Sequence, residues 1–427
     1  MKVLVIGGGG REHAIVWKLA QSRRVDKIYC CPGNTGIADL AECVNIDPMD
    51  FGALLNLVKY EWIDLTVVGP EAPLAAGIAT AFRKDGRKIF GPGADAAKLE
   101  ASKSFSKDFM RRYALPTAEY KVFNSYVHAE DYVRLKGAPI VIKADGLAAG
   151  KGVIVAKTVQ EAADALRLIM KERAFGEAGD KVVVEDCIEG EEASFMAFTD
   201  GKTIIPMVSS QDHKRIFDKD HGPNTGGMGA YSPAPVLGPE MEKTVMETVM
   251  KPFLRGVQAE GMDFRGVIYA GLMIKDGKPY VLEFNCRFGD PETQAILRRL
   301  DSDFFEIILS TSEGKLAQAN VQWKQESSVC VVMASGGYPG SYQKGKIISG
   351  LDKAGKMKDV VVFHSGTGFD GEHVVTDGGR VLGVTATGRD VKEAKTRAYE
   401  AVEKISFEGM QFRTDIADRA IKGSTCE

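Results

Sequence analysis

Over the first hundred residues, short and mostly apolar runs alternate with longer stretches in which apolar residues recur at helical spacing. The apolar runs are Val3–Ile6, Ile28–Cys31, Leu65–Gly69 and Ile89–Gly91. Apolar strands that alternate with helices are typical of a parallel sheet covered by helices on both faces. We therefore predict a doubly wound parallel α/β domain over residues 1–103.

The middle of the chain predicts a small lobe inserted into a larger domain. Helical spacing continues from Ala94 to Tyr113 and stops before Pro116, because a residue ahead of proline is driven out of the helical region. Two apolar runs around a glycine-rich turn follow, with helical stretches beside them. This segment is short, so we expect a lobe at 123–192 inserted into a central domain of residues 104–122 and 193–325.

The last hundred residues predict a mostly antiparallel cap, which we place at residues 326–427. Apolar runs occur at Val329–Ala334, Val360–His364 and Val381–Thr387, and helical spacing follows from Asp390 to Ile405. Glycine-rich turns separate these runs, as is common between antiparallel strands. The whole chain is thus a mixed α/β and α+β multidomain protein.

Composition narrows the class of partner. The 427 residues carry 58 acidic and 55 basic side chains, a net charge of -3, so no overall positive field exists to bind nucleic acid or an anionic membrane. No apolar run approaches ~20 residues, and the scattered cysteines form no Cys-x-x-Cys pair. We expect a cytoplasmic protein, with small molecules as its partners.

The first strand runs into a glycine-rich turn. Gly8, Gly9 and Gly10 precede a helix, where backbone N–H groups can bind an anion. Glu12 replaces the third glycine of a dinucleotide fingerprint, and no acid ends the second strand, so an oxidoreductase with a nicotinamide or flavin cofactor is disfavoured. The turn is either a phosphate site or a tight turn that serves packing.

Glu71 follows another strand of the same sheet. The carboxyl edge of such a sheet is where ligands bind, so Glu71 is a candidate acceptor for sugar hydroxyl groups. Its alternative role is that of an ordinary acid in the first turn of a helix after Pro70.

The stretch from Pro139 to Ala156 is the most informative. It departs from a phosphate-binding P-loop in spacing, and Gly152 stands where Ser or Thr is needed. We predict a flexible glycine-rich flap between two antiparallel strands, with Gly150, Lys151 and Gly152 near phosphates. Lys143 ends an apolar strand, where a cation costs free energy unless an anion meets it. The alternative is a lysine that extends to solvent.

Two further segments carry acids in suggestive positions. In 185–192 a strand passes through a bend into an acidic hairpin, which suits an adenine edge and ribose hydroxyls but is also common at solvated edges. In 280–287, strict alternation predicts Glu283, Asn285 and Arg287 on one face, with Leu282, Phe284 and Cys286 on the other. The polar face suits Mg²⁺ and a phosphoryl group, or is simply exposed to solvent.

Two polar segments complete the candidates. Asp290 is a plausible helix N-cap ahead of Pro291. Residues 209–231 show little helix or strand periodicity, and loops of this length are usually functional or disordered. Within them His213 has no ligand-spaced partner, so a metal role there is disfavoured.

The flap after Lys143, the 185–192 segment and the Glu283–Arg287 strand together resemble the ATP-grasp superfamily. Further runs narrow the resemblance to the phosphoribosylamine–glycine ligase family, namely Gly7–His13, Gln211–Arg215, Gly222–Pro233 and Arg287–Thr293. The similarity covers essentially the whole chain. It implies an ATP-grasp fold and a ligase that joins glycine to 5-phospho-β-D-ribosylamine, with ATP cleaved to ADP and phosphate, in purine synthesis.

The resemblance also implies the roles of individual residues. Those expected at ATP are Lys103 and Lys143 on the phosphates, Glu185 with the backbone of Cys187 and Ile188 at adenine, and Glu192 or Glu191 at the ribose. Glu283 and Asn285 are implied as ligands of Mg²⁺ or Mn²⁺. The neighbouring strand Val267–Ile274 has no carboxylate, so phosphate oxygens and water are expected to complete the metal shell.

The implied reaction passes through glycyl phosphate. We expect Arg287 at the glycine carboxylate and the transition state, with Lys143 and the metal offsetting charge. Residues expected at the amine substrate are Gly8, Gly9 and Gly10 at its 5-phosphate, Glu71 at its hydroxyls, and Gly226 and Gly227. Asp290 and the Asp212–Lys214 segment are expected to position either the amine or the phosphate. The alternatives are a carboxyaminoimidazole- or formate-using purine ligase and a nucleotide-binding regulator without catalysis. We expect a monomer.

Overall fold

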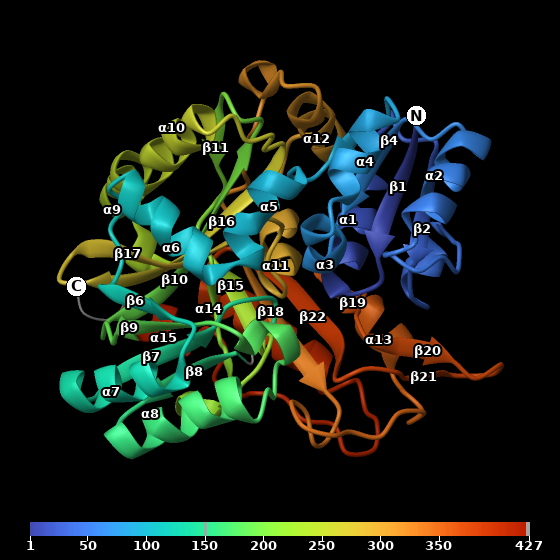
Figure 1. Cartoon of the computed structure of the whole chain (residues 1–427). Helices are drawn as coiled ribbons and strands as arrows, with labels where there is room; N and C mark the ends of the chain where they lie inside the picture. Colours follow the sequence, from blue (N-terminus) through green and yellow to red (C-terminus); the bar gives the residue numbers. More distant parts are fainter. Residues whose placement is uncertain (149–151, 424–427) are drawn as a thin grey trace.

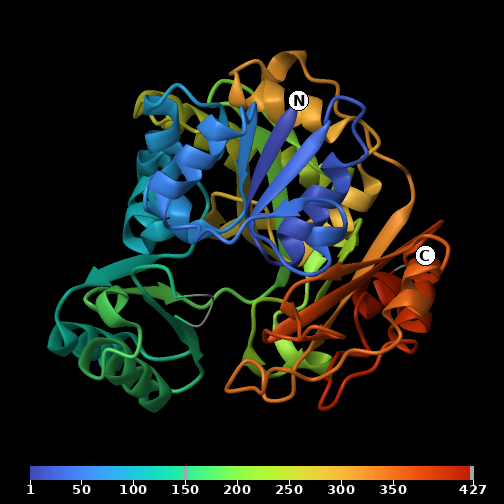
Figure 2. The same ribbon diagram turned by 90° about the vertical axis from the view of Figure 1, so that its right-hand side faces the viewer.

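The computed structural model describes residues 1–148 and 152–423. Figure 1 shows the amino-terminal sheet in blue, the small lobe in teal and green, and the carboxy-terminal strands in orange and red. In the view of Figure 2 the small lobe lies below the amino-terminal sheet and beside the carboxy-terminal part. Several chain segments that are distant in sequence therefore meet around one central region.

The amino-terminal sheet is parallel, as predicted. Its strands are β1 (Lys2–Gly7), β2 (Lys27–Pro32), β3 (Glu42–Cys43), β4 (Leu65–Val68) and β5 (Ile89–Phe90), in the order β3-β2-β1-β4-β5. The helices are α1 (Gly10–Leu19), α2 (Phe51–Tyr60), α3 (Glu71–Ala75) and α4 (Ile78–Lys84). The strand order reverses between β1 and β4, so the turns that follow these two strands lie side by side at the carboxyl edge.

The helix predicted as continuous from Ala94 to Tyr113 is in fact two helices, α5 (Ala94–Ala101) and α6 (Lys103–Arg112). Ser102 is extended between them, and its hydroxyl accepts a hydrogen bond from the Phe105 N–H at 3.2 Å. A serine N-cap satisfies a backbone donor at the start of a helix and so stabilises the break. As a result α6 begins at Lys103.

The small lobe is a four-stranded antiparallel sheet with helices on one face. Its elements are β6 (Tyr120–Phe123), α7 (Tyr126–Lys136), β7 (Ile140–Ala144), β8 (Val153–Ala156), α8 (Val159–Leu166) and β9 (Val182–Asp186), with the strands ordered β6-β9-β7-β8. The glycine-rich stretch joins β7 to β8, as predicted. Ala149, Gly150 and Lys151 lie outside the described residues.

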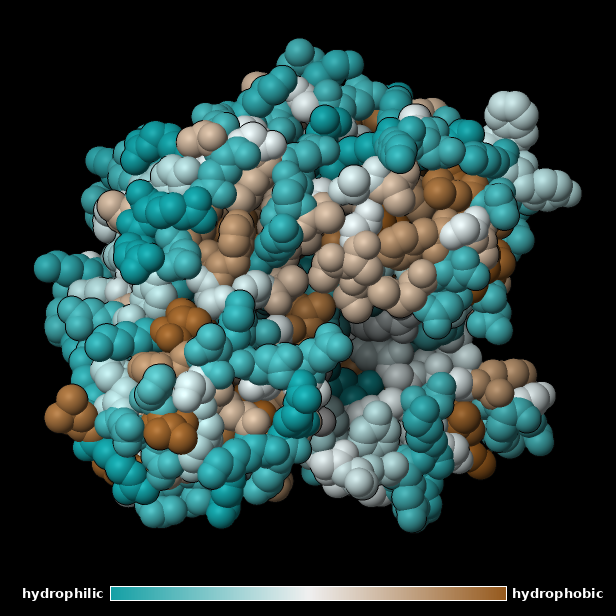
Figure 3. All heavy atoms as spheres, in the orientation of Figure 1, coloured by the Kyte–Doolittle hydropathy of each residue, from teal (hydrophilic) through white to brown (hydrophobic). Residues whose placement is uncertain are grey.

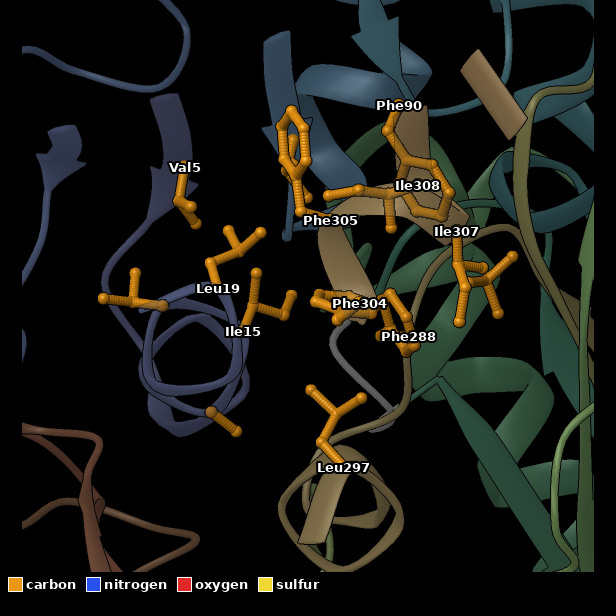
Figure 4. Packing of buried hydrophobic residues seen from close by; sticks show 14 of the residues in the cluster. Val5, Ile15, Leu19, Phe90, Phe288, Leu297, Phe304, Phe305, Ile307 and Ile308 are labelled. Atoms are coloured by element: carbon orange, nitrogen blue, oxygen red, sulfur yellow. The ribbon is translucent and has the colours of Figure 1, made fainter. Parts of the chain in front are cut away.

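The central sheet is antiparallel, with strands β10 (Glu191–Thr199), β11 (Ile204–Pro206), β16 (Gly266–Lys275) and β17 (Lys278–Asn285) in the order β11-β10-β16-β17. Its helices are α9 (Pro239–Val245), α10 (Lys251–Ala259), α11 (Glu292–Arg299) and α12 (Phe304–Ser312). One face packs on α10, where the Phe253 and Phe284 rings lie 5.0 Å apart. On the other face Phe288 packs between Phe90 and Phe304 (Figure 4).

The strict alternation predicted for residues 280–287 is interrupted. Phe284 and Cys286 enter the core as expected, but Val281 is buried there instead of Leu282, which lines a cavity. The pairing of β16 with β17 shifts register after Gly271, where a bulge inserts one extra residue. The bulge keeps Glu283 and Asn285 on the side away from the core.

The carboxy-terminal sheet is antiparallel, as predicted, and its order is β12-β15-β18-β22-β19. Its strands are β12 (Gln211–Asp212), β15 (Gly229–Ser232), β18 (Ser327–Ala334), β19 (Val360–His364) and β22 (Arg380–Gly388). Around it lie α13 (Leu351–Gly355), β20 (Thr367–Phe369), β21 (Val374–Thr376), α14 (Val391–Val402) and α15 (Asp418–Gly423). The pairing of β15 with β18 joins the central region to this sheet.

The segment 209–231, which showed no periodicity, is not an irregular loop. It holds β12, β13 (Arg215–Phe217), β14 (His221–Asn224) and β15. Strands of two to four residues are too short for alternation to be recognised, and these depend on pairing with distant partners. The proposed domain boundaries themselves stay a prediction.

Candidate active site

A cavity of about 490 Å³ lies where the small lobe, the amino-terminal sheet, the central sheet and the carboxy-terminal sheet meet. The space-filling view shows the surface hollowed between the small lobe and the carboxy-terminal part (Figure 3). Predicted residues that line it are Glu71, Lys103, Lys143, Gly152, Glu185, Cys187, Ile188, Glu192, Asp212, Lys214, Gly226, Glu283, Asn285, Arg287 and Asp290. The fold thus brings most of the sequence candidates to one place.

Other candidates do not line this cavity. Among the described residues, the lining does not include Gly8, Gly9, Gly10, Glu191 or Gly227. Glu191 accepts a hydrogen bond from the Gln211 side chain at 3.0 Å, whereas Gly227 packs against Asp290 and Pro291. Gly150 and Lys151 lie outside the described residues.

The glycine turn after β1 is packed against the Glu12 side chain. The Gly9 N–H donates to Glu12 Oε2 at 2.7 Å. A Cβ on Gly7 would lie 2.6 Å from Glu12 Cγ, and one on Gly69 would lie 1.9 Å from Glu12 Oε1. A carboxylate therefore occupies this turn and uses one of its N–H groups. This geometry is that of a tight turn, and the predicted phosphate site at Gly8–Gly10 finds no support in it.

A buried charge cluster links the small lobe to α6. Glu185 Oε1 lies 3.0 Å from Lys143 Nζ, and Glu185 Oε2 lies 2.9 Å from Lys107 Nζ. The side chains of Glu185 and Lys107 are 2% exposed and that of Lys143 is 6% exposed. Burial lowers the pKa of Lys107 to about 8, although Glu185 opposes the shift. The carboxylate of Glu185 is thus engaged by two lysines.

Lys103 lies at the flap. Its Nζ donates to the Gly146 carbonyl at 2.8 Å, and Asp145 accepts hydrogen bonds from the N–H and hydroxyl of Ser104. Burial lowers the pKa of Lys103, opposed mainly by the charge of Glu283. The start of α6 and the start of the flap are therefore held together, with an ammonium group facing the cavity.

Glu283 and Asn285 present oxygen atoms to the cavity from alternate positions of β17. Burial tends to raise the pKa of Glu283, but the charges of Lys214, Lys143 and Lys103 outweigh it and hold the pKa below its usual range. Within residues 1–148 and 152–423, Glu283 forms no ion pair or side-chain hydrogen bond. A carboxylate and an amide oxygen without a competing ion pair fit a hard cation such as Mg²⁺.

The described residues supply few further donors for such an ion. No group of three or more His, Cys, Asp or Glu side chains among them is arranged to hold a metal. Gly271 lies opposite Glu283 on β16, where a carboxylate would be needed for a third protein ligand. The donor set therefore fits an ion that takes its remaining ligands from substrate phosphates and water.

Arg287 is held by two carboxylates. Its Nη2 lies 3.0 Å from Glu100 Oε1 and its Nε lies 3.5 Å from Glu71 Oε2. The same Nη2 donates to Asn285 Oδ1 at 3.3 Å. Burial tends to lower the pKa of Arg287, but Glu100 and Glu71 overcome this and raise it. Glu71 is the first residue of α3 and also lines the cavity, while its role as an acceptor of sugar hydroxyls stays a prediction.

Asp290 is not a helix N-cap, because α11 begins at Glu292 and Pro291 takes that position. The Asp290 carboxylate instead accepts hydrogen bonds from Gln294 at 2.7 Å and from Arg380 at 3.1 Å. Arg380 belongs to β22 and also donates to the Gly226 carbonyl at 2.7 Å. Burial tends to raise the pKa of Asp290, but Arg380 outweighs it and holds the pKa low.

Asp212 and Lys214 enter the cavity from the same short segment. Lys214 Nζ lies 3.0 Å from Glu192 Oε2. Burial raises the pKa of Asp212 to about 7, opposed by Lys214 and assisted by Glu292 and Glu192. Beside them, Glu292 accepts hydrogen bonds from Tyr269 at 2.6 Å and from Ser194 at 3.1 Å.

Sequence reasoning missed several charged residues of this cavity. They are Arg11, Glu100, Lys107, Glu292 and Arg380. Lys107 had a signal, because it lies one helical turn after Lys103 on an amphipathic helix. Arg380 had none, because it follows a glycine turn 90 residues beyond its partner Asp290.

Comparison with known proteins identifies the family. The models for the N, ATP-grasp (A) and C domains of phosphoribosylglycinamide synthetase match residues 1–100, 101–293 and 328–419. The chain belongs to this family. Curated relatives named phosphoribosylamine–glycine ligase include those of Escherichia coli O6:H1, 54% identical over 426 residues, and Vibrio parahaemolyticus, 52% identical over 424 residues. Each alignment covers 99% of this chain and 99% of the relative.

Solved structures agree with this membership. The phosphoribosylamine–glycine ligase of Thermotoga maritima superposes with a TM-score of 0.86 at 34% identity, covering 98% of this chain and all of that one. A biotin carboxylase domain from Hydrogenobacter thermophilus superposes with a TM-score of 0.72 at 15% identity, covering 96% of this chain and 91% of that one. The second likeness concerns the fold alone. Together they confirm the predicted ATP-grasp fold with its amino-terminal parallel sheet.

Over the part of the chain that the structure describes, no helix is both long enough and apolar enough to cross a bilayer.

Proposed function

We propose that this chain is an ATP-dependent carboxylate–amine ligase that joins glycine to 5-phospho-β-D-ribosylamine. Its products are glycinamide ribonucleotide, ADP and phosphate, and it serves de novo purine biosynthesis. One observation carries the proposal, namely the full-length identity of 52–54% to proteins named phosphoribosylamine–glycine ligase. The cavity adds support, because it gathers lysines and oxygen donors where a triphosphate needs them.

ATP binds between the small lobe and the central sheet in this proposal. Lys103 and Lys143 contact the phosphates, and the flap with Gly150, Lys151 and Gly152 covers them. The backbone of Cys187 and Ile188 meets the adenine edge, while Glu192 or Glu191 holds the ribose. The sequence suggested that Glu185 contacts adenine. Its two carboxylate oxygens instead pair with Lys107 and Lys143, so we propose that Glu185 acts on adenine through its neighbours.

Glu283 and Asn285 are the residues that would hold Mg²⁺ or Mn²⁺ beside those phosphates. When bound, such an ion neutralises phosphate charge and favours transfer of the terminal phosphoryl group. The low pKa of Glu283 supports this role, because a deprotonated carboxylate is ready to bind a cation at neutral pH.

Glycine activation follows from the position of Arg287. The glycine carboxylate and the terminal phosphoryl group repel each other, so a cation between them aligns the attack and stabilises the charge that develops. Arg287 supplies that charge, Glu100 and Glu71 fix its orientation, and Lys143 faces the same cavity. The product of this step is glycyl phosphate, which survives only if water is kept from the cavity while it forms.

The amine substrate lies toward the amino- and carboxy-terminal sheets. We place its ribose hydroxyls at Glu71 and its positioning contacts at Asp290, Gly226 and the Asp212–Lys214 segment. Gly227 acts indirectly, because it packs under Asp290. We keep the turn at Gly8–Gly10 as a proposed neighbour of the 5-phosphate, although the Gly9 N–H already donates to Glu12.

One assay tests the function. The purified protein is supplied with ATP, Mg²⁺ and phosphoribosylamine, and ADP formation is measured with glycine or with another small acid such as alanine, formate or bicarbonate. ADP formation that requires both glycine and phosphoribosylamine supports the proposal. ADP formation with formate or bicarbonate in place of glycine would assign a different ligase, and no ADP formation with any acid would refute the proposal. We further propose the domain boundaries given above and a monomer.

A further inference from the structure

The carboxylates around the cavity differ in what they touch. Those that line it are Glu71, Glu100, Glu185, Asp186, Glu192, Asp212, Glu283, Asp290 and Glu292. Within the described residues, all except Asp212 and Glu283 form an ion pair or accept a hydrogen bond from another side chain. Glu283 belongs to the proposed metal site. Asp212 is therefore a cavity carboxylate that lies outside the proposed metal site and has neither of these interactions, so its chemical role needs a separate explanation.

The backbone holds Asp212 rigidly. Asp212 pairs with Ala230 of β15 in the antiparallel ladder, and β15 in turn pairs with β18. The next residue, His213, points to the other side of the strand and packs against Tyr231, with ring centroids 5.9 Å apart. Asp212 is only 8% exposed, and it lines the cavity. A preorganised sheet position suits a group that must meet a reacting atom.

Charged groups on each neighbouring element set the affinity of Asp212 for a proton. On its own segment Lys214 stabilises the carboxylate, whereas Glu192 of β10 and Glu292 of α11 oppose it. Tyr269 of β16 also lines the cavity, and its hydroxyl donates to Glu292. Burial and the two glutamates outweigh the lysine and raise the pKa of Asp212 to about 7. A group with such a pKa can accept and release a proton at neutral pH.

The proposed reaction needs such a group in its second half. When an amine nitrogen attacks an acyl phosphate, the new N–C bond leaves a proton on the nitrogen that must depart. Asp290 and Glu71 are poor acceptors, because neighbouring arginines hold their pKa values low. Burial raises the pKa of Glu100, but its carboxylate is bound to Arg287 and to the Cys286 N–H. Glu292 is bound to the Tyr269 and Ser194 hydroxyls.

We propose that Asp212 is the base that takes the proton from the attacking amine of phosphoribosylamine. The step rests on the proposed function. The amine lone pair forms the N–C bond to the glycyl carbonyl, the bond from that carbon to the phosphoryl oxygen breaks, and inorganic phosphate leaves. The nitrogen proton passes to Asp212 and from there to solvent or to the departing phosphate. The charge of Lys214 favours the ionised form of Asp212, which is the form that can accept a proton.

The test separates proton removal from glycine activation. Asp212→Asn keeps the shape of the side chain but cannot take a proton. Asp218→Asn is the matched control, because it removes a nearby carboxylate that does not line the cavity. Among the described residues this carboxylate accepts hydrogen bonds from Thr414 alone. Two reactions are measured for each variant: ligation of phosphoribosylamine, and formation of glycine hydroxamate from ATP, glycine and hydroxylamine. Hydroxylamine is a strong nucleophile that is largely unprotonated at neutral pH, so it needs little help from a base.

We expect Asp212→Asn to lower the ligation rate by about 10²–10⁴-fold while hydroxamate formation stays within about threefold of the wild type. The ligation rate of the wild type should decrease as the pH drops below about 7, with the slope expected for a single titrating group. This inflection should be missing from the residual ligation rate of the variant. Asp212→Glu should recover part of the rate. Asp218→Asn should leave both reactions unchanged.

Three results would overturn the inference. One is ligation by Asp212→Asn within threefold of the wild type, and another is a pH profile that the substitution does not alter. The third is an equal loss of hydroxamate and ligation, which would place Asp212 in glycine activation instead. Failure of the wild type to form either product would instead remove the proposed function, and this inference with it.

Discussion

Removing the charge of Glu185 should destabilise the protein in a manner that depends on pH. In Glu185→Gln, Lys107 and Lys143 lose a carboxylate that lies within 3.0 Å of each ammonium group. Breaking a buried ion pair usually costs about 3–5 kcal/mol. Lys107 limits the loss by releasing its proton. Its pKa is already about 8, and each unit between pKa and pH costs about 1.4 kcal/mol, so neutralisation at pH 7 is inexpensive. We expect a net loss of about 2–4 kcal/mol at pH 7.

The sign of the pH effect follows from Lys107. Its folded pKa is below its unfolded value, so the folded state binds fewer protons and stability rises as the pH increases through the folded pKa toward about 10. Glu185→Gln lowers the folded pKa further. The deficit relative to the wild type should therefore be larger at pH 6 than at pH 9.

Urea unfolding followed by circular dichroism at pH 6, 7 and 9 measures this difference. The control is Glu130→Gln, which breaks an exposed Glu130–Arg134 pair of the same lobe and should cost less than about 0.5 kcal/mol. The double variant Glu185→Gln, Lys107→Met should recover part of the stability, because it leaves one fewer buried cation unpaired. If Glu185→Gln and Glu130→Gln are equally stable at pH 6, the reasoning about this cluster is wrong.

Three other substitutions test separate parts of the structure. Arg287→Ala should lower kcat/KM for glycine by about 10²–10³-fold in ADP-release kinetics, and near-normal turnover with an unchanged glycine KM would contradict its proposed role. Gly69→Ala should lower the free energy of unfolding by about 1–3 kcal/mol, because its Cβ would lie 1.9 Å from Glu12 Oε1; equal urea midpoints would contradict this packing. Asp212→Asn should be more stable than the wild type above pH 7, by about 1–4 kcal/mol, because the folded wild type binds a proton more tightly than the unfolded chain between pH 4 and 7. Urea unfolding at pH 5 and 8 checks it, and an advantage that does not grow with pH would refute it.

Local patterns predicted the elements that are long enough to show a period. The parallel strands of the amino-terminal sheet, the pair around the flap and β19 all follow from runs of apolar residues. The two-residue strand at Gln211 and Asp212 left no such pattern, since it forms only by pairing with β15. The break at Ser102 was also missed, because apolar spacing continues across it. The break depends on Ser102 capping α6, where its hydroxyl accepts a hydrogen bond from the Phe105 N–H.

The candidate site was predicted where motifs carry the chemistry. Lys143, Glu283, Asn285 and Arg287 line the cavity as expected. Their partners were harder to find, since Glu100 joins Arg287 across 187 positions of sequence and no local pattern records such a contact.

The sequence by itself determined the kind of protein: a parallel sheet at the start, an ATP-grasp centre and a set of lysines and acids that line one cavity, because the motifs that carry them are short stretches of chain. Only the tertiary structure decided how those charges are used. It placed Glu12 in the glycine turn and bound Glu185 to two lysines, and among the described residues it gave the Asp212 carboxylate no ion pair and no hydrogen bond from another side chain. The protonation of a buried group depends on which charges the fold brings within a few ångströms, and that distance is set by packing between elements far apart in sequence.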